Sequence, residues 1–281
     1  MKKLGILLDS FSGYGQKDLK KMGIEYINQT TIVDGVSYKD GIDLELKDPK
    51  GLKIIQEGKD IKSSMPAIGL VAEKMEQMSK EYENVIYFAM NKGISSTFST
   101  GMAAASDFDN VTVISNKMIS SAQTDTSIEA MKMANKGASL EEVLKYFEEM
   151  AKDSYGFVIP KDVKGLIKSG RVSGAKKVIL EKAKLIPSLL VTEDGFKVDS
   201  TKRNFSKIVK NTIEKIIESI GKENVDKYNW EVIHTGDQTT KNKVILAFKE
   251  YEIKDYRENW ASITIAAHTG IGAIGISVWK K

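Results

Sequence analysis

Short apolar runs alternate with amphipathic stretches through the first half of the chain. Apolar, β-branched clusters predict strands, and apolar residues recurring every three to four positions predict helices. The predicted extended segments are residues 4–8, 24–33, 85–90 and 111–114, and the predicted helices are 66–80, with Pro66 in its first turn, 99–106, 121–135 and 140–152. Alternation of strand and helix is typical of a parallel α/β sheet with crossover helices.

After about residue 155 the pattern changes to a hairpin mixed with helices. Two extended runs, 185–192 and 196–200, flank the turn signal Glu193-Asp194-Gly195. The other predicted strands are 156–159, 231–234, 253–256, 261–267 and 273–278, and the predicted helices are 161–168, 205–220 and 239–251. We therefore predict an α/β fold of two domains: an N-terminal α/β domain with a parallel sheet over residues 1–155, and a C-terminal α+β domain over residues 156–281.

Composition narrows the chemistry. The 281 residues include no cysteine, which excludes disulfides, thiolate metal sites and cysteine nucleophiles, and two histidines, which leave little room for a histidine-rich metal site. We expect no metal and no cofactor. The formal net charge of +4 is spread along the chain, whereas nucleic-acid binding usually needs a concentrated basic face, so we expect no nucleic-acid partner.

No export or membrane signal is predicted. The apolar stretch that follows Met1-Lys2-Lys3 ends at Asp9, which is too short for the core of a secretory signal. No run of about 18 uncharged apolar residues occurs. We expect a cytoplasmic, soluble protein.

Polar residues interrupt the apolar pattern at three predicted strand or helix ends in the first half. Asp9-Ser10 ends the first strand, where it either caps a turn or forms a polar floor under a ligand. Ser63 and Ser64 precede a predicted helix, either as ordinary caps or beside backbone N–H groups that are free to bind an anion. Five hydroxyls then occur within residues 95–100, more than one cap requires, and this favours an anion site: Ser95, Ser96, Thr97, Ser99 and Thr100.

Two further candidates lie in the second half. Residues 268–275 spell His-Thr-Gly-Ile-Gly-Ala-Ile-Gly after a predicted strand, but too little chain follows for a dinucleotide-binding unit. The glycines favour close approach of the backbone to a ligand or to another strand, and His268 is either structural or a donor to a carboxylate. Arg171 lies between Gly170 and Gly174, where it either presents its guanidinium to an anion or a partner or is a surface arginine.

Familiar catalytic motifs are missing from the sequence. It contains no P-loop, no G-x-S-x-G elbow and no H-E-x-x-H motif. A hydrolase that uses Ser95, His268 and Asp9 stays open as an alternative, although no spacing supports it.

Seven stretches, taken in order, resemble motifs of the DegV family. They are Asp9-Ser10, residues 33–41, Ser63-Ser64-Met65-Pro66-Ala67, residues 94–101, Gly170-Arg171-Val172-Ser173, residues 187–195 and residues 268–275. Ser63 stands where the family usually has threonine, and Ile271 where it usually has proline. The resemblance spans the whole chain.

The resemblance implies one long-chain fatty acid, such as palmitate or oleate, in a tunnel between the two domains. It also implies a non-catalytic carrier that presents the carboxylate to a separate ATP-dependent fatty acid kinase subunit and carries the acyl-phosphate towards phospholipid synthesis. The carboxylate site falls on Ser63, Ser95 and His268, with Ser64 and Ser96 as close alternatives. Residues expected nearby or facing the partner are Arg171, Asp9, Ser10, Thr269 and Gly270.

Other functions remain to be weighed against this one. The second hypothesis is a stand-alone serine/histidine hydrolase or a phosphotransferase that acts on an acyl or phosphoryl ester. DNA binding rests only on the mild positive charge, which would equally favour an acidic partner or transient contact with an anionic membrane surface.

Overall fold

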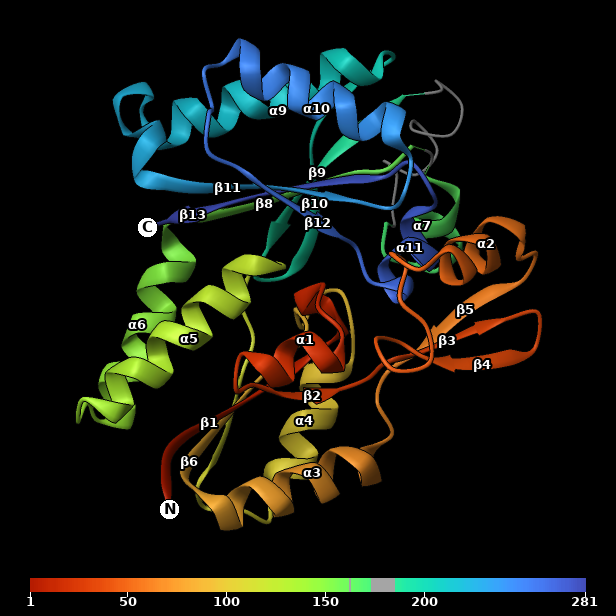
Figure 1. Ribbon diagram of the computed structural model, residues 1–281. Helices are drawn as coiled ribbons and strands as arrows, with labels where there is room; N and C mark the ends of the chain where they lie inside the picture. Colours follow the sequence, from red (N-terminus) through yellow and green to blue (C-terminus); the bar gives the residue numbers. More distant parts are fainter. Residues whose placement is uncertain (162, 173–184) are drawn as a thin grey trace.

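The computed structural model describes residues 1–161, 163–172 and 185–281 (Figure 1). The N-terminal half is built on a parallel four-stranded sheet in the order β2-β1-β6-β7. Its strands are β1 (Lys2–Asp9), β2 (Glu25–Ile27), β6 (Tyr82–Phe88) and β7 (Val111–Ile114). The predicted α/β class with an N-terminal parallel sheet is confirmed.

Helices cover both faces of this parallel sheet because its strands are apolar on both sides. Leu4, Ile6 and Leu8 of β1 pack against α5 (Ser121–Asn135) and α6 (Leu140–Lys152). Leu7 points to the other face, in a cluster with buried residues of α3 (Ile68–Glu81) and α4 (Thr97–Ala105). The bounds of α5 and α6 agree with the prediction.

A small antiparallel sheet, β4-β3-β5, stands beside the parallel one. It contains β3 (Thr30–Val33), β4 (Val36–Lys39) and β5 (Ile61–Ser64), accompanied by η1 (Ser10–Ser12), α1 (Gln16–Lys21) and α2 (Pro49–Glu57). The single extended segment predicted over 24–33 is therefore two strands in two sheets, with a break at Asn28-Gln29. This break carries the chain from the parallel sheet to the small one.

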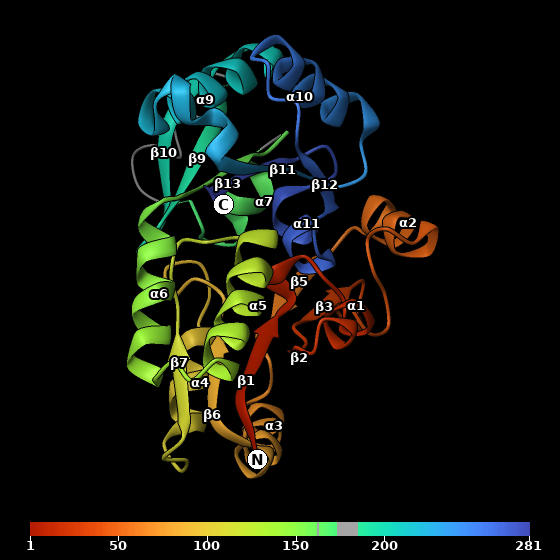
Figure 2. The ribbon, with the colours of Figure 1, turned by 60° about the vertical axis from the view of Figure 1, so that its left-hand side comes forward.

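The C-terminal half is a mixed six-stranded sheet in the order β10-β9-β8-β13-β11-β12, covered on one face by α9 and α10 (Figure 2). Its elements are β8 (Ser154–Ile159), α7 (Lys164–Lys168), β9 (Ile186–Thr192), β10 (Gly195–Lys202), α9 (Phe205–Ile220), η2 (Lys222–Lys227), β11 (Tyr228–His234), α10 (Gln238–Glu250), β12 (Arg257–Trp260), α11 (Ile263–Thr269) and β13 (Ile274–Lys280). The predicted hairpin is confirmed as the antiparallel pair β9 and β10. The domain boundary between residues 155 and 156 stays a prediction.

Two predicted strands near the C-terminus are wrong. Residues 261–267 fall mostly in the helix α11, and the strand predicted at 253–256 lies further along, as β12. The run Ile263-Thr264-Ile265 looks like a strand by its β-branched content. The Ser262 side chain accepts a hydrogen bond from the backbone N–H of Ile265 and so caps a helix that local propensity disfavours.

The second face of the six-stranded sheet turns towards the N-terminal half. α5 and α6 contact β13, and side chains from both halves share one apolar cluster that includes Phe11, Ile119 and Ile233. No helix in the described ranges is long and apolar enough to cross a membrane.

Candidate functional site

A cavity of about 330 Å³ lies between the parallel sheet and the six-stranded sheet. Phe11 follows β1, Met90 follows β6 and Ile119 follows β7, so the carboxyl ends of three parallel strands all contribute to its wall. Ligands of open α/β sheets bind at this edge. The volume falls in the range of pockets that take small molecules.

The cavity wall is mostly apolar. Its apolar side chains are Phe11, Met65, Met90, Ile94, Ile119, Val158, Leu166, Phe196, Ile233, Ala261, Ile265, Ala273 and Ile274. Two polar residues of the wall already have partners: the Ser120 hydroxyl donates to Glu231, and the Thr235 hydroxyl donates to the carbonyl oxygens of Gly270 and Ala273. They therefore offer little free hydrogen-bonding capacity to a ligand.

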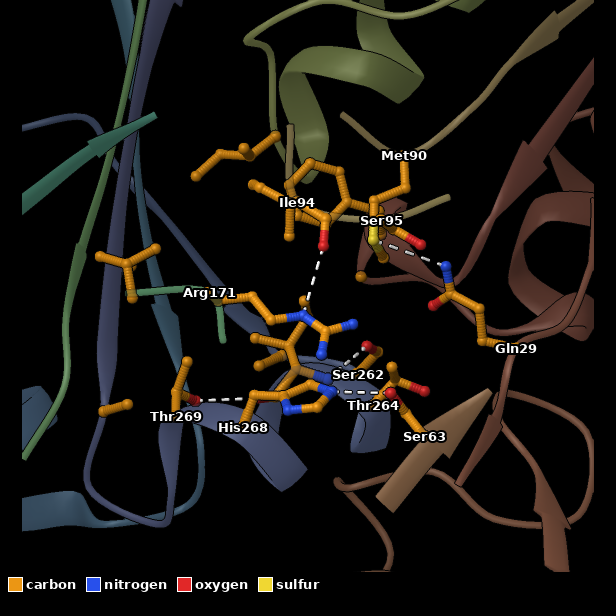
Figure 3. Close-up of a pocket in the computed structure, with 18 of the residues that line it drawn as sticks. Gln29, Ser63, Met90, Ile94, Ser95, Arg171, Ser262, Thr264, His268 and Thr269 are labelled. Carbon is orange, nitrogen blue, oxygen red and sulfur yellow. Dashed lines mark hydrogen bonds between the residues drawn. The ribbon is translucent and has the colours of Figure 1, made fainter. Parts of the chain in front are cut away.

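Ser262 and Thr269 also line the cavity, but their hydroxyls bond the backbone of Ile265. Six further polar residues form what we call the head-group cluster (Figure 3). It consists of Gln29, Ser63, Ser95, Arg171, Thr264 and His268. One side of the cavity is lined by exposed residues: Ser64, Met65 and Ser96. We call this side the mouth. The cavity thus combines an apolar wall with a compact polar group beside solvent.

Ser63 and His268 form the central contact of the cluster. The Ser63 hydroxyl and Nε2 of His268 share a hydrogen bond of 2.7 Å between β5 and the last turn of α11. The exposed Ser64 hydroxyl instead donates to the carbonyl oxygen of Met65. The prediction that these serines cap a helix is wrong, because they end a strand and α3 begins only at Ile68, after Pro66.

Asp40 fixes α11 and, through it, His268. The Asp40 carboxylate accepts hydrogen bonds from the backbone N–H groups of Ile263 and Thr264, at 3.3 and 2.9 Å. Burial raises the pKa of Asp40 to about 6, although these hydrogen bonds oppose the shift. Burial, helped by the positive charge of Arg171, lowers the pKa of His268 to about 4. The imidazole is therefore neutral at neutral pH and acts as a hydrogen-bonding group.

Ser95 lies in the loop that leads into α4. Its hydroxyl shares a hydrogen bond of 2.8 Å with the Thr97 hydroxyl and accepts one from the backbone N–H of Thr97. Buried Asn91 anchors this loop, because its amide donates to the carbonyl oxygens of Asn116 and Thr192. The predicted hydroxyl-rich turn at a helix start is confirmed in position.

Arg171 extends from the loop after α7 towards the cluster (Figure 3). Its Nη1 donates to the carbonyl oxygen of Ser169 at 2.8 Å and its Nε to that of Ile94 at 3.3 Å. These two bonds leave further N–H groups of the guanidinium for an anion. Ser173 and Gly174, the rest of this predicted motif, lie outside the described residues.

Asp9 and Ser10 do not line the cavity. The Asp9 carboxylate accepts hydrogen bonds from the backbone N–H groups of Phe11 and Met90, which do line it, and burial raises the Asp9 pKa to about 6. The Ser10 hydroxyl bonds Tyr26 and accepts from the N–H of Gln29. Both residues accept hydrogen bonds from the backbone N–H groups of residues that line the cavity. This matches the capping interpretation rather than that of a polar floor in contact with a ligand.

The other two predicted neighbours differ from one another. Thr269 lines the cavity, and its hydroxyl donates to the carbonyl oxygen of Ile265. Gly270, with φ of 76°, ends α11 outside the lining.

Gly275 lies close to Ile233 of the adjacent strand, where an added Cβ would come within 3.1 Å of Ile233 Cβ. Close approach of a strand, one of the two predicted roles, accounts for this glycine.

The three residues of the hydrolase alternative do not form a relay. His268 bonds Ser63, Ser95 bonds Thr97, and Asp9 bonds backbone N–H groups. Within residues 1–161, 163–172 and 185–281, no group of three or more metal-binding side chains comes together.

Gln29 is a cavity residue that the sequence interpretation missed. It is 2% exposed and joins the wall from the break between β2 and β3. The signal in the sequence is faint: Asn28-Gln29 interrupts an otherwise apolar and β-branched stretch.

Comparisons with known proteins find matches to one family along nearly the whole chain. The family described as "Uncharacterised protein, DegV family" matches residues 3–281. A DegV domain-containing protein of Staphylococcus aureus (strain MRSA252) is 28% identical over 283 residues, covering 100% of each chain. A DegV domain-containing protein of Caldanaerobacter subterraneus subsp. tengcongensis is 28% identical over 287 residues, again covering 100% of each.

Solved structures share the fold. DegV, a fatty acid binding protein from Bacillus subtilis, has a TM-score of 0.86 at 24% identity, with 100% of each chain covered. A fatty-acid-binding DegV family protein from Thermus thermophilus has a TM-score of 0.85 at 20% identity, covering 99% of this chain and 100% of that one. A stearic acid-binding protein from Eubacterium ventriosum has a TM-score of 0.83 at 19% identity, covering 99% and 98%.

Proposed function

The chain belongs to the DegV family, and on this basis we propose that it binds one long-chain fatty acid in the cavity between its two sheets. The observation that carries the proposal is an apolar wall that ends in the head-group cluster. Three solved proteins of the same fold are described as binding fatty acids. A fatty acid has the matching shape, since it is a long apolar chain with one small polar end.

The energies of burial indicate that the apolar wall provides affinity and the polar cluster provides orientation. Burial of each methylene contributes about 0.8 kcal/mol, so about fifteen methylenes give on the order of 12 kcal/mol before the costs of ordering the chain. The apolar wall can therefore supply the affinity. The polar end has only to orient the carboxyl group.

In this proposal the carboxylate contacts Ser63, Ser95 and His268, with the Arg171 guanidinium close by. The hydroxyls and the neutral His268 ring act as hydrogen-bonding partners, while Arg171 offsets the cost of placing a negative charge in a half-buried site. The mouth lies beside these groups, so the bound carboxyl group would stay within reach of a second protein.

The finer part of the proposal is a carrier role in the cytoplasm, without a cofactor. The protein would present the carboxylate to an ATP-dependent fatty acid kinase subunit and then carry the acyl-phosphate, with transient membrane contact when it takes up or releases lipid. The lack of a Ser95–His268–Asp9 relay in the described structure favours a carrier over a stand-alone hydrolase.

Ligand identity tests the proposal most directly. Native mass spectrometry of the purified protein should show one bound mass that matches a long-chain acid such as palmitate or oleate, and organic extraction should release that acid. A ligand-free mass, together with no uptake of added palmitate or oleate, contradicts fatty-acid binding.

The same preparation separates a carrier from a catalyst. The protein alone should neither hydrolyse acyl esters nor form acyl-phosphate from palmitate and ATP, whereas acyl-phosphate should form once an ATP-using kinase subunit is added. Turnover by the protein alone would favour the hydrolase or phosphotransferase alternative.

A further inference from the structure

Gln29 reaches the cavity from a rigid piece of backbone. Its backbone N–H donates to the Ser10 hydroxyl at 3.1 Å, and its carbonyl oxygen accepts from the N–H of Asp40 at 2.9 Å. The residue is 2% exposed and its side chain lines the cavity. The fold therefore delivers a buried amide to the head-group cluster with little freedom to withdraw it.

The Gln29 amide is poorly satisfied. Its Nε2 lies 3.5 Å from Thr97 Oγ1, at the limit for a hydrogen bond, and 3.6 Å from Met90 Sδ, which is only a weak acceptor. Its Oε1 has no hydrogen-bond partner within the described part of the chain. A buried amide group without partners costs about 1–3 kcal/mol. An amide in this condition on a cavity wall indicates a ligand that carries a polar group.

Gln29 and its neighbour Thr31 are linked to Ser63 and Ser95, two of the three hydroxyls of the head-group cluster. Thr31 follows Gln29 by two positions and pairs with Ser63 in the small sheet, while Thr97, which Gln29 approaches, bonds Ser95. In Figure 3 the amide of Gln29 enters the cluster from the side opposite Arg171, with Nε2 turned towards Met90. The amide can therefore meet a carboxyl group held between Ser63 and Ser95.

We propose that Gln29 is a further ligand of the carboxyl group of the bound fatty acid, an inference that rests on the function proposed above. Nε2 donates to a carboxylate oxygen, and Oε1 turns to accept from the Thr97 hydroxyl. The two ends of the amide have nearly the same shape, so this turn leaves the packing unchanged. Gln29 thereby favours ligands that carry a carboxyl group, while the apolar wall binds the hydrocarbon chain of the fatty acid.

Gln29→Met tests this assignment, because methionine keeps the length of the side chain and removes its polar atoms. In titrations with palmitate the variant should bind about 10- to 100-fold more weakly, the effect expected for one hydrogen bond to a charged group. The same factor should hold for myristate, since the lost contact is at the carboxyl end. Gln123→Met is the matched control: Gln123 is also buried with both amide atoms unpartnered among the described residues, yet it lies outside the cavity lining.

Gln29→Glu is the second variant, should the methionine variant not fold. Its carboxylate would repel the carboxylate of the ligand at neutral pH. The palmitate affinity of the variant, divided by that of wild type at the same pH, should therefore rise as acidification protonates the glutamate. Palmitate affinity that equals wild type in Gln29→Met, or in Gln29→Glu at every pH, overturns the role of Gln29 and leaves the proposed function standing. Failure of the wild-type protein to bind palmitate removes both.

Discussion

Ser63 and Ser64 are neighbours with identical side chains, yet the structure gives them different partners. Ser63 bonds His268 inside the cavity, whereas Ser64 bonds the carbonyl oxygen of Met65 at the exposed mouth. The alternation of side chains along β5 causes the difference, because successive residues of a strand point to opposite faces. The family resemblance ranked Ser63 ahead of Ser64, but the local sequence pattern could not, since it placed both serines before a helix and not in a strand.

Because the two serines have different partners, we expect their alanine variants to behave differently. Ser63→Ala should weaken palmitate binding about tenfold, because the carboxyl group loses a hydroxyl and His268 loses the partner that orients its ring. Ser64→Ala is the control and should bind as wild type does. Isothermal titration of both variants measures the effect, and equal loss in the two would remove Ser63 from the head-group cluster.

At the scale of elements, α11 shows where local pattern and tertiary structure disagree. Its β-branched residues predict a strand, but two contacts stabilise the helix: the Ser262 cap, which is local, and the Asp40 carboxylate, which comes from a distant part of the chain. The long amphipathic helices α6 and α9 were predictable because each buries one apolar face at the helical period. α11 was not, since the contact from Asp40 leaves no trace in the local sequence.

Asp40→Ala should therefore act on both folding and binding. The backbone N–H groups of Ile263 and Thr264 would lose their acceptor, and we expect a loss of about 1–2 kcal/mol in the free energy of unfolding. Palmitate affinity should fall as well, because α11 carries Thr264 and His268 into the cavity. Urea unfolding and ligand titration provide the two readouts. Wild-type affinity in a folded Asp40→Ala variant would show that α11 keeps its place without Asp40.

At the scale of the whole molecule, contacts between the two halves surround the cavity. Glu231 of β11 is fully buried and accepts hydrogen bonds from the Ser120 hydroxyl at 3.2 Å, from the backbone N–H of Ser121 at 3.2 Å and from the Ser121 hydroxyl. Ser121 begins α5, whose positive helix end also favours this carboxylate. The sequence predicted two sheets, but not this carboxylate between them, because Glu231 lies within an ordinary strand pattern.

Glu231 predicts a pH-dependent stability. Burial raises its pKa from 4.5 to about 7, so the native state holds the proton more tightly than the unfolded chain does. This contribution is fully present below pH 4.5 and is lost as the pH rises through about 7. Its size is on the order of 3 kcal/mol. Glu231→Gln should remove it, so the stability of the variant relative to wild type should increase from pH 5 to pH 8.

Chemical unfolding at several pH values checks this prediction. Glu129→Gln is the control, because Glu129 lies on α5 but its side chain is 43% exposed and paired with Lys132. Asp9 and Asp40 also have raised pKa values, and they cancel in the comparison because both proteins retain them. A variant whose stability parallels wild type over this range would contradict the assignment of a buried, proton-binding Glu231.

The position of the head-group cluster at the mouth has a kinetic consequence. A fatty acid held there with its carboxyl end outward must enter tail first and leave head first, drawing its whole chain past Ser64, Met65 and Ser96. Each methylene that returns to water adds to the barrier, so residence time should lengthen with chain length. Reaction at the exposed carboxyl group does not require that withdrawal. The carboxyl group of a bound long-chain acid would thus be open to reaction without the acid leaving the protein.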